Sequence, residues 1–272
     1  MQNYSSSPEE LVYSLWRNRH LIKALTIRDV LGRYKGSYLG ILWSFFNPLL
    51  MLGVYTFTFT TIFKSQWGGE IASHGQFALF LFIGLIFFNL FGESINRSAG
   101  IIVGNANYVK KIVFPLEIMP WVVLFSALFH ALISLAVWFI AYIILIGTPQ
   151  ATCLILPLII APLIFLTAGL SLIIAALGVY MRDITQVIGV FVSALMFLTP
   201  IFYPITAIPE GYRGLFLINP LTFIIENIRK VLISGYFPDF YALFLMIAIS
   251  LIILLIGFKV FQSSRRGFAD VL

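Results

Sequence analysis

Uncharged apolar segments dominate this sequence and constrain its fold more than any other feature. Six segments contain no Asp, Glu, Lys or Arg, at residues 38–63, 77–91, 118–146, 152–180, 184–203 and 240–258. About 20 apolar residues in a helix cross the ~30 Å hydrocarbon core of a bilayer. The whole chain is 60% hydrophobic and 10% charged, whereas a soluble domain has about 25% charged residues. The sequence therefore predicts an all-α integral membrane protein, with six transmembrane helices in a domain over residues 37–261.

The basic residues are distributed unevenly between the connections. Of the 17 Lys and Arg residues, 13 lie in residues 1–37, 92–117, 181–183 and 259–272, and the connections on the opposite side hold the other four. Because Lys and Arg accumulate on the cytoplasmic side of a membrane, we expect both termini in the cytoplasm, with residues 262–272 as a cytoplasmic tail. This distribution accounts for the net charge of +6 without a nucleic-acid partner.

The N-terminal region combines a helix start with an apolar repeat. Ser7, Pro8 and Glu10 supply a hydroxyl cap, a proline at the first helical position and an acidic residue three positions after the cap. Apolar residues then recur at positions 11, 12, 15, 16, 21, 22 and 25 among basic ones. We interpret residues 1–36 as a cytoplasmic amphipathic helix lying in the lipid headgroup layer. The alternative is a solvated basic leader.

The predicted external connection over residues 204–239 is long and unusually apolar. Asn219-Pro220 is typical of a helix start, and Gly235 follows the expected end of that helix. Within it, Glu226 and Lys230 have the four-residue spacing of an ion pair on one helix face. A second short helix is expected over residues 209–218. Neither helix is long enough to cross the membrane, so we predict short re-entrant helices that form an external lid.

Several classes of function lack the residues that they need. The sequence has no GxxxxGK[ST] motif for binding ATP phosphates, and its one cysteine, Cys153, excludes an internal disulfide or a cysteine-based metal cluster. Carriers coupled to protons or sodium use charged groups inside the membrane, and the six segments contain none; we interpret His130 as a helix-packing residue. The scattered acidic residues argue against an enzyme. What remains is a pore or translocator without a cofactor, driven by another protein.

The aromatic content of 16% bears on the cargo of such a translocator. Aromatic faces stack on sugar rings without imposing one pattern of hydrogen bonds, and such a lining would let a long glycan slide. Aromatic residues also face lipid and form belts at the membrane surface. The aromatic content alone therefore leaves both interpretations open.

Four motifs, in order along the chain, resemble those of a known family. They are RYKGSYLGILWSFFNPLLMLGVYTFTF (residues 33–59), NYVKKIVFPLEIMP (107–120), YMRDI (180–184) and TPIFYPITAIPEGYRGLFLINPLTFIIENIR (199–229). Together they resemble the membrane subunit of type-2 ABC exporters, in the branch that exports lipid-linked polysaccharides such as O-antigen. Teichoic-acid and capsule permeases are relatives in that branch. The resemblance extends over essentially the whole chain.

This resemblance implies the partners of the chain and the place where one of them docks. It implies a homodimer in a bacterial inner membrane, working with two copies of a cytoplasmic ATPase that bind ATP and Mg. It also implies that the ATPase docks on the connection over residues 92–117, with the turn after the fourth span as a second contact or brace. The residues expected to contact the ATPase are Asn96, Arg97, Asn105, Asn107, Tyr108, Arg182 and Asp183.

The implied substrate is an undecaprenyl-pyrophosphate-linked glycan, most closely O-antigen. Its anionic headgroup needs basic partners, and we expect Arg28, Arg33 and Lys35 to bind it at the cytoplasmic surface. The predicted wall of the glycan channel is Tyr38, Trp43, Phe46, Tyr55, Phe59, Phe191, Phe197, Phe202 and Tyr203. The alternatives are an ABC exporter of teichoic acid, capsule or small lipids and drugs, and a membrane channel outside the ABC families.

Overall fold

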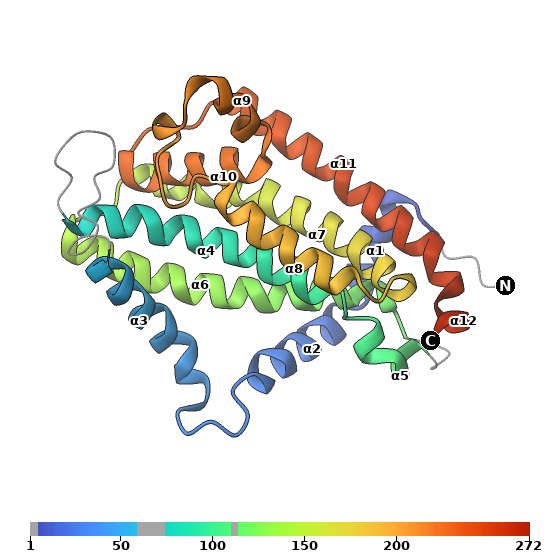
Figure 1. Ribbon diagram of the computed structural model, residues 1–272. Helices are drawn as coiled ribbons and strands as arrows, with labels where there is room; N and C mark the ends of the chain where they lie inside the picture. Colours follow the sequence, from blue (N-terminus) through green and yellow to red (C-terminus); the bar gives the residue numbers. More distant parts are fainter. Residues whose placement is uncertain (1–4, 59–73, 110–113) are drawn as a thin grey trace.

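Every regular element in the described part of the chain is a helix, as the sequence predicts (Figure 1). The structure, a computed structural model, describes residues 5–58, 74–109 and 114–272. Five helices are long and apolar enough to cross a membrane by length and composition. They are α3 (Trp43–Phe57, extended by a 3₁₀ turn over Gly40–Leu42), α4 (His74–Ser98), α6 (Met119–Leu145), α7 (Leu156–Tyr180) and α11 (Phe240–Ser264).

The first and last helices lie at the same end of this bundle, which we call the termini end (Figure 1). They are α1 (Pro8–Arg17) and α12 (Phe268–Val271), and the short helix α5 (Ala106–Val109) lies at this end with them. The Tyr180 hydroxyl donates a hydrogen bond to the Ser264 carbonyl at 2.7 Å, which joins the ends of α7 and α11. The helix ends that lead to α8 and α12 are therefore held together.

The N-terminal region forms two helices rather than the single one predicted. The Ser7 hydroxyl accepts the Glu10 N–H at 3.2 Å, so the predicted helix start is correct, but α1 ends at Arg17 and α2 (Arg19–Gly32) follows. The Asn18 side chain donates to the Ser14 carbonyl at 2.8 Å across the break.

The apolar side of α2 packs against the protein. Ile22 and Leu25 form a buried cluster with Ile118 and Val122 at the start of α6. Trp16, by contrast, is 68% exposed. Part of the predicted apolar stripe, at Ile22 and Leu25, therefore packs on α6, whereas Trp16 remains exposed on the surface of the protein.

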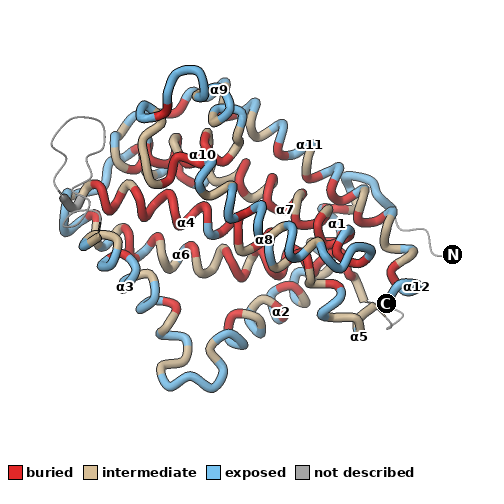
Figure 2. Tube along the Cα trace, viewed as in Figure 1, coloured by how far each residue is buried: buried red, intermediate tan, exposed pale blue. Residues whose placement is uncertain are grey.

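The bundle is organised around α4, which is buried along most of its length (Figure 2). It packs against α3, α6, α7, α8 and α10, whereas most residues of α3 and α11 are not buried. The most extensive helix contact in the described residues joins α7 and α11. A Cβ atom on Gly257 of α11 would lie 2.2 Å from the Gly169 carbonyl oxygen of α7, so the two backbones approach too closely for a side chain. Small residues allow such close approach between membrane helices.

The fifth predicted span, over residues 184–203, is shorter than expected. Helix α8 runs over Ile184–Phe197, and its 14 residues measure about 21 Å at 1.5 Å per residue. A proline lacks the backbone N–H and disfavours helical geometry at the residue before it, and Pro200 follows the end of α8 closely. The chain turns there and does not complete a full-length span.

Two short helices follow α8, as the sequence predicts for the connection over residues 204–239. They are α9 (Glu210–Ile218) and α10 (Pro220–Arg229). The Asn219 side chain accepts the Leu221 N–H at 3.0 Å, and Gly235 has a left-handed φ of +72° after the final turn. Helix α10 packs against both α4 and α7, with its apolar residues buried. It is therefore part of the bundle rather than a cover above it.

One buried arginine joins α10 to the rest of the bundle. The Arg229 side chain is 2% exposed and donates to the Phe80 carbonyl of α4 at 3.0 Å. It also donates to the carbonyls of Pro200 at 2.6 Å and Ile201 at 2.9 Å. Its charge is paired with Glu226 at 2.8 Å. The predicted pairing of Glu226 with Lys230 is therefore wrong, since Glu226 pairs with Arg229, one residue nearer.

Replacing Gly257 with alanine should destabilise the bundle. The new methyl group would overlap the Gly169 carbonyl, and overpacking of this kind costs about 1–3 kcal/mol. Gly189→Ala on α8 is the matched control, because nothing lies within 4 Å of its Cβ position. The thermal midpoint of the purified protein in detergent should fall for Gly257→Ala alone. Equal midpoints for the two variants would contradict this account of the α7–α11 contact.

Candidate functional site

A network of four charged side chains joins α2 to α4 at the point where we expect the substrate headgroup. The Arg33 guanidinium donates to the Glu93 carboxylate. Arg97 donates to the same carboxylate at 3.2 Å and to Asp29 of α2 at 2.6 Å. The sequence placed Glu93 and Arg97 in a connection, but α4 continues to Ser98, so both lie on one continuous helix. Their i, i+4 spacing places them on the same helix face.

The network is balanced in charge. Burial raises the pKa of the Asp29 carboxyl, but hydrogen bonding and charge from Arg97 outweigh it, so the net shift in pKa is downward. Burial lowers the pKa of Arg33, and the Glu93 carboxylate more than restores it. Asp29 and Arg33 are therefore both ionised at neutral pH. The formal charges of the two carboxylates and two guanidinium groups sum to zero, which leaves no net positive charge within the network.

The other two predicted headgroup residues lie in different surroundings. Arg28 of α2 donates to the Tyr108 hydroxyl of α5 at 3.2 Å, and the Tyr108 ring stacks on Phe114 with centroids 4.4 Å apart. Lys35 is exposed after the end of α2 and forms no ion pair with any residue in the described ranges. The structure thus connects Arg28, predicted to bind substrate, directly to Tyr108, predicted to bind the ATPase.

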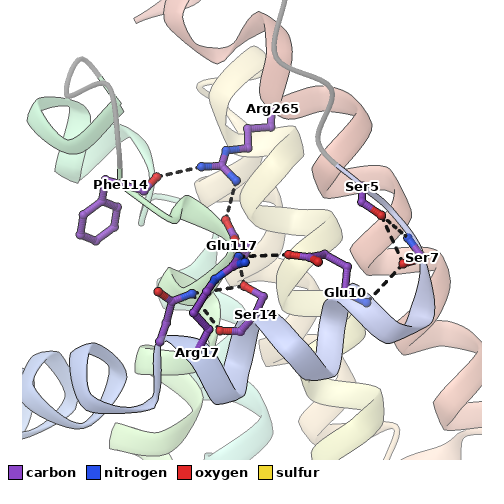
Figure 3. Close-up of polar contacts among 9 residues, drawn as sticks. Ser5, Ser7, Glu10, Ser14, Arg17, Phe114, Glu117 and Arg265 are labelled. Carbon is purple, nitrogen blue, oxygen red and sulfur yellow. Dashed lines mark hydrogen bonds and ion pairs between the residues drawn. The ribbon is translucent and has the colours of Figure 1, made fainter.

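A second charged site, not anticipated from the sequence, lies at the termini end (Figure 3). Glu117 precedes α6 and is 5% exposed. It accepts the Ser14 hydroxyl of α1 at 2.9 Å and an Arg265 N–H at 2.6 Å. Arg265 also donates to the Phe114 carbonyl at 2.8 Å. One carboxylate therefore joins the N-terminal helix, the start of α6 and the C-terminal segment. The only sequence signal was a lone acidic residue within the apolar run FPLEIMP.

The remaining residues predicted to contact the ATPase also lie toward the termini end. Asn96 and Asn107 are exposed, and Asn105 donates to the Ile101 carbonyl at 2.9 Å. Arg182 and Asp183 are exposed in the turn between α7 and α8, and no ion pair joins them in the described structure. Residues 110–113 of the expected docking connection lie outside the described residues.

The predicted channel aromatics divide into two groups on separate helices. Helix α3 packs on α4 and α6, whereas α8 packs on α4 and α7, so α4 separates the two groups within one chain. Tyr38, Phe46, Phe191 and Phe197 are exposed, and Trp43, Tyr55, Phe202 and Tyr203 are half-buried. Phe59 lies outside the described residues.

Neutralising Glu117 should loosen the termini end. Glu117→Gln keeps the size of the side chain but removes one partner of the buried ion pair between Glu117 and Arg265 at 2.6 Å, a change that costs about 3–5 kcal/mol. Glu10→Gln is the matched control, because Glu10 forms a solvent-accessible pair with Arg17 at 3.1 Å and such pairs contribute about 0–1 kcal/mol. The thermal midpoint should fall for Glu117→Gln and stay near the parent value for Glu10→Gln. A similar small change in the thermal midpoint of both variants would show that the Glu117 ion pair does not stabilise the termini end.

Comparison with known proteins places this architecture in a family. The family described as ABC-2 type transporter matches residues 20–233. The chain is 28% identical to an O-antigen export system permease protein, RfbA, of Myxococcus xanthus over 96% of this chain and 98% of that protein. It is 28% identical to an RfbA of Klebsiella pneumoniae over 97% and 99% of the two chains. It is 27% identical to the polysialic acid transport protein KpsM of Escherichia coli over 90% and 94%. With most of its length matched and its helices suited to a membrane, the chain belongs to the ABC-2 type transporter family.

Proposed function

We propose that this protein is the transmembrane subunit of an ATP-driven exporter that moves lipid-linked polysaccharide, with O-antigen as the first candidate. The observation that carries the proposal is similarity over nearly the full chain to two O-antigen export system permease proteins and a polysialic acid transport protein. A relative named for polysialic acid is almost as similar as those named for O-antigen. Polysaccharide as the cargo is therefore better supported than O-antigen in particular.

The energy for transport comes, in this proposal, from a separate ATPase. The sequence has no P-loop of its own, and ABC-2 membrane subunits work with nucleotide-binding partners. Two copies of the ATPase, holding ATP and Mg, would dock at the termini end on Asn96, Arg97, Asn105, Asn107 and Tyr108. Arg182 and Asp183 would form the second contact. This end would face the cytoplasm of a bacterial cell, with both termini on that side of the inner membrane.

A homodimer would complete the path for the glycan. Helices α3 and α8 both expose aromatic and apolar side chains, including Phe46, Phe191 and Phe197, while α4 separates them within one chain. A second copy could bring α3 of one chain near α8 of the other. The two predicted groups of aromatic residues would then line a shared channel.

The Arg28–Tyr108 contact suggests how ATPase movement reaches the substrate. Tyr108 belongs to the short helix α5 in the expected docking connection, and Arg28 belongs to α2. Arg28 and Lys35 would meet the pyrophosphate headgroup first, because neither has a carboxylate partner in the described structure. Arg33 would join them when the headgroup replaces Glu93 as its anionic partner.

The proposal is tested by identifying the partners and the cargo. The tagged chain is purified in mild detergent from its native host, with and without trapped ATP, and its deletion strain is examined for lipid-linked glycan. A stoichiometric soluble ATPase and accumulation of the glycan are expected. Recovery of the chain alone in several detergents would favour a channel outside the ABC families. An ATPase without glycan accumulation would favour export of small lipids or drugs.

The role of Arg33 can be separated from its ion pair with Glu93. If Arg33 binds the headgroup, Arg33→Gln should lower export roughly tenfold, because a hydrogen bond to a charged group contributes about 1.5–3 kcal/mol. Glu93→Gln is the matched variant: it breaks the same ion pair but keeps the guanidinium, and it should export near the parent level. Surface polysaccharide and membrane insertion are measured together. Equal loss of export in both variants would assign Arg33 a structural role.

A further inference from the structure

A polar cavity of about 260 Å³ lies between α3, α4 and α6. Asn47 of α3, Asn89 of α4 and His130 of α6 line it within the candidate membrane spans, and Tyr34 and Arg33 line it from the turn after α2. Polar side chains inside membrane spans are costly and usually mark a functional path. Because several such residues line one cavity, we expect the cavity to hold a molecule that can form hydrogen bonds with them.

The hydrogen-bonding groups of the cavity are incompletely paired in the described structure. The Nε2 atom of His130 is buried without a hydrogen-bond partner, and its Nδ1 atom is 3.4 Å from the Tyr34 hydroxyl. Asn47 and Asn89 are exposed where they line the cavity, and no hydrogen bond joins either side chain to another residue in the described ranges. An unsatisfied polar group in the hydrocarbon region, such as the buried Nε2 atom of His130, costs several kcal/mol. These groups are thus arranged toward a ligand or water rather than toward one another.

The charge of the cavity favours a neutral ligand over a bare phosphate. Arg33 is its cation, and that charge is already paired with Glu93, which also lines the cavity. Amide, imidazole and phenol groups can each donate and accept hydrogen bonds. A sugar hydroxyl also donates and accepts, so a polyhydroxyl ligand suits this set of side chains better than a group that only accepts.

An aromatic surface completes the site. Tyr55 of α3 and Phe82 of α4 both line the cavity, and their ring centroids are 6.5 Å apart. Aromatic faces pack against apolar C–H surfaces while leaving polar edges for hydrogen bonds, which is the arrangement that a sugar ring requires. The volume is below the ~300–1,000 Å³ typical of small-molecule sites, so it suits one ring and not an oligosaccharide.

We propose that this cavity binds one uncharged sugar residue of the transported glycan inside a single chain, between α3, α4 and α6. The inference rests on the proposed function and deepens it by naming the part of the substrate held there. It places Tyr55 in a binding site within the chain and assigns His130 a ligand-binding role beyond helix packing.

Site-specific photocrosslinking in the native host tests the proposal. The photoreactive residue p-benzoylphenylalanine replaces Asn89 in one strain and Leu132 in the control strain; Leu132 lies on α6 and is 55% exposed. Irradiation should produce a glycan adduct from position 89 that disappears when glycan synthesis is deleted, and none from position 132. A third strain carries the photoreactive residue at Phe197. An adduct at 197 but none at 89 would overturn the cavity proposal and leave polysaccharide export intact. No adduct at any position, with no glycan accumulation in the deletion strain, would overturn both.

Smaller substitutions at Asn89 test the proposal even if the bulky photoreactive residue disturbs folding. Asn89→Leu should lower export at least tenfold while the ATPase still co-purifies, and Asn89→Ser, which keeps a hydroxyl in the cavity, should retain most of the export. Unchanged export in Asn89→Leu would mean that the cavity holds water only, which would overturn the proposal. Equal loss of export in Asn89→Leu and Asn89→Ser would also overturn the proposal. The loss would then come from the changed size of the side chain and not from the lost hydrogen-bonding group.

Discussion

The need to satisfy backbone carbonyls within a membrane governs the architecture around α8. A helix that stops after 14 residues leaves its last carbonyl groups without intrahelical partners, and hydrocarbon supplies no donors. Arg229 donates to two carbonyls just beyond that end, those of Pro200 and Ile201. Asn219 adds donation to the Thr199 hydroxyl at 2.9 Å and to the Leu198 carbonyl at 3.3 Å. The segment that follows the short helix therefore receives hydrogen-bond donors from α10 and its cap, inside the bundle.

The position of Arg229 also explains a feature of α4. A Cβ atom at Gly84 would lie 2.7 Å from Nη2 of Arg229, and that guanidinium has little freedom to move, because it bonds to carbonyls from two segments and to Glu226. A glycine at position 84 is what allows the arginine to reach the α8 end across the surface of α4. The short span, the returning helix and the glycine thus depend on one another.

Local features could be predicted from the sequence, and features that depend on distant partners could not. Uncharged apolar segments identified the long helices, and the caps at Ser7 and Asn219 were recognisable because a cap forms within a few residues. The shortened α8 was missed because apolar composition continues past Pro200, although the helix does not. The ion pair of Glu117 with Arg265 spans 148 residues, and no local pattern indicates such a partner. In the candidate site, the sequence identified the basic residues near the first span. It did not show that Arg33 and Arg97 form ion pairs with carboxylates from other segments.

Helix α2 and the residue after it connect the predicted docking helix α5, the charged network on α4 and the polar cavity. Arg28 contacts Tyr108 of α5, Asp29 contacts Arg97 of α4, and Arg33 contacts Glu93 beside the polar cavity. These three residues lie within about two helical turns, at the end of α2 and in the residue that follows it, so one short segment carries all three contacts. The ion pairs to α4 are half-buried, which makes them stronger than surface pairs but less costly to separate than fully buried ones. In the proposed mechanism, a change at α5 would act on the cavity through Arg33 and Glu93, because the contacts to α5, to α4 and to the cavity all come from this one segment.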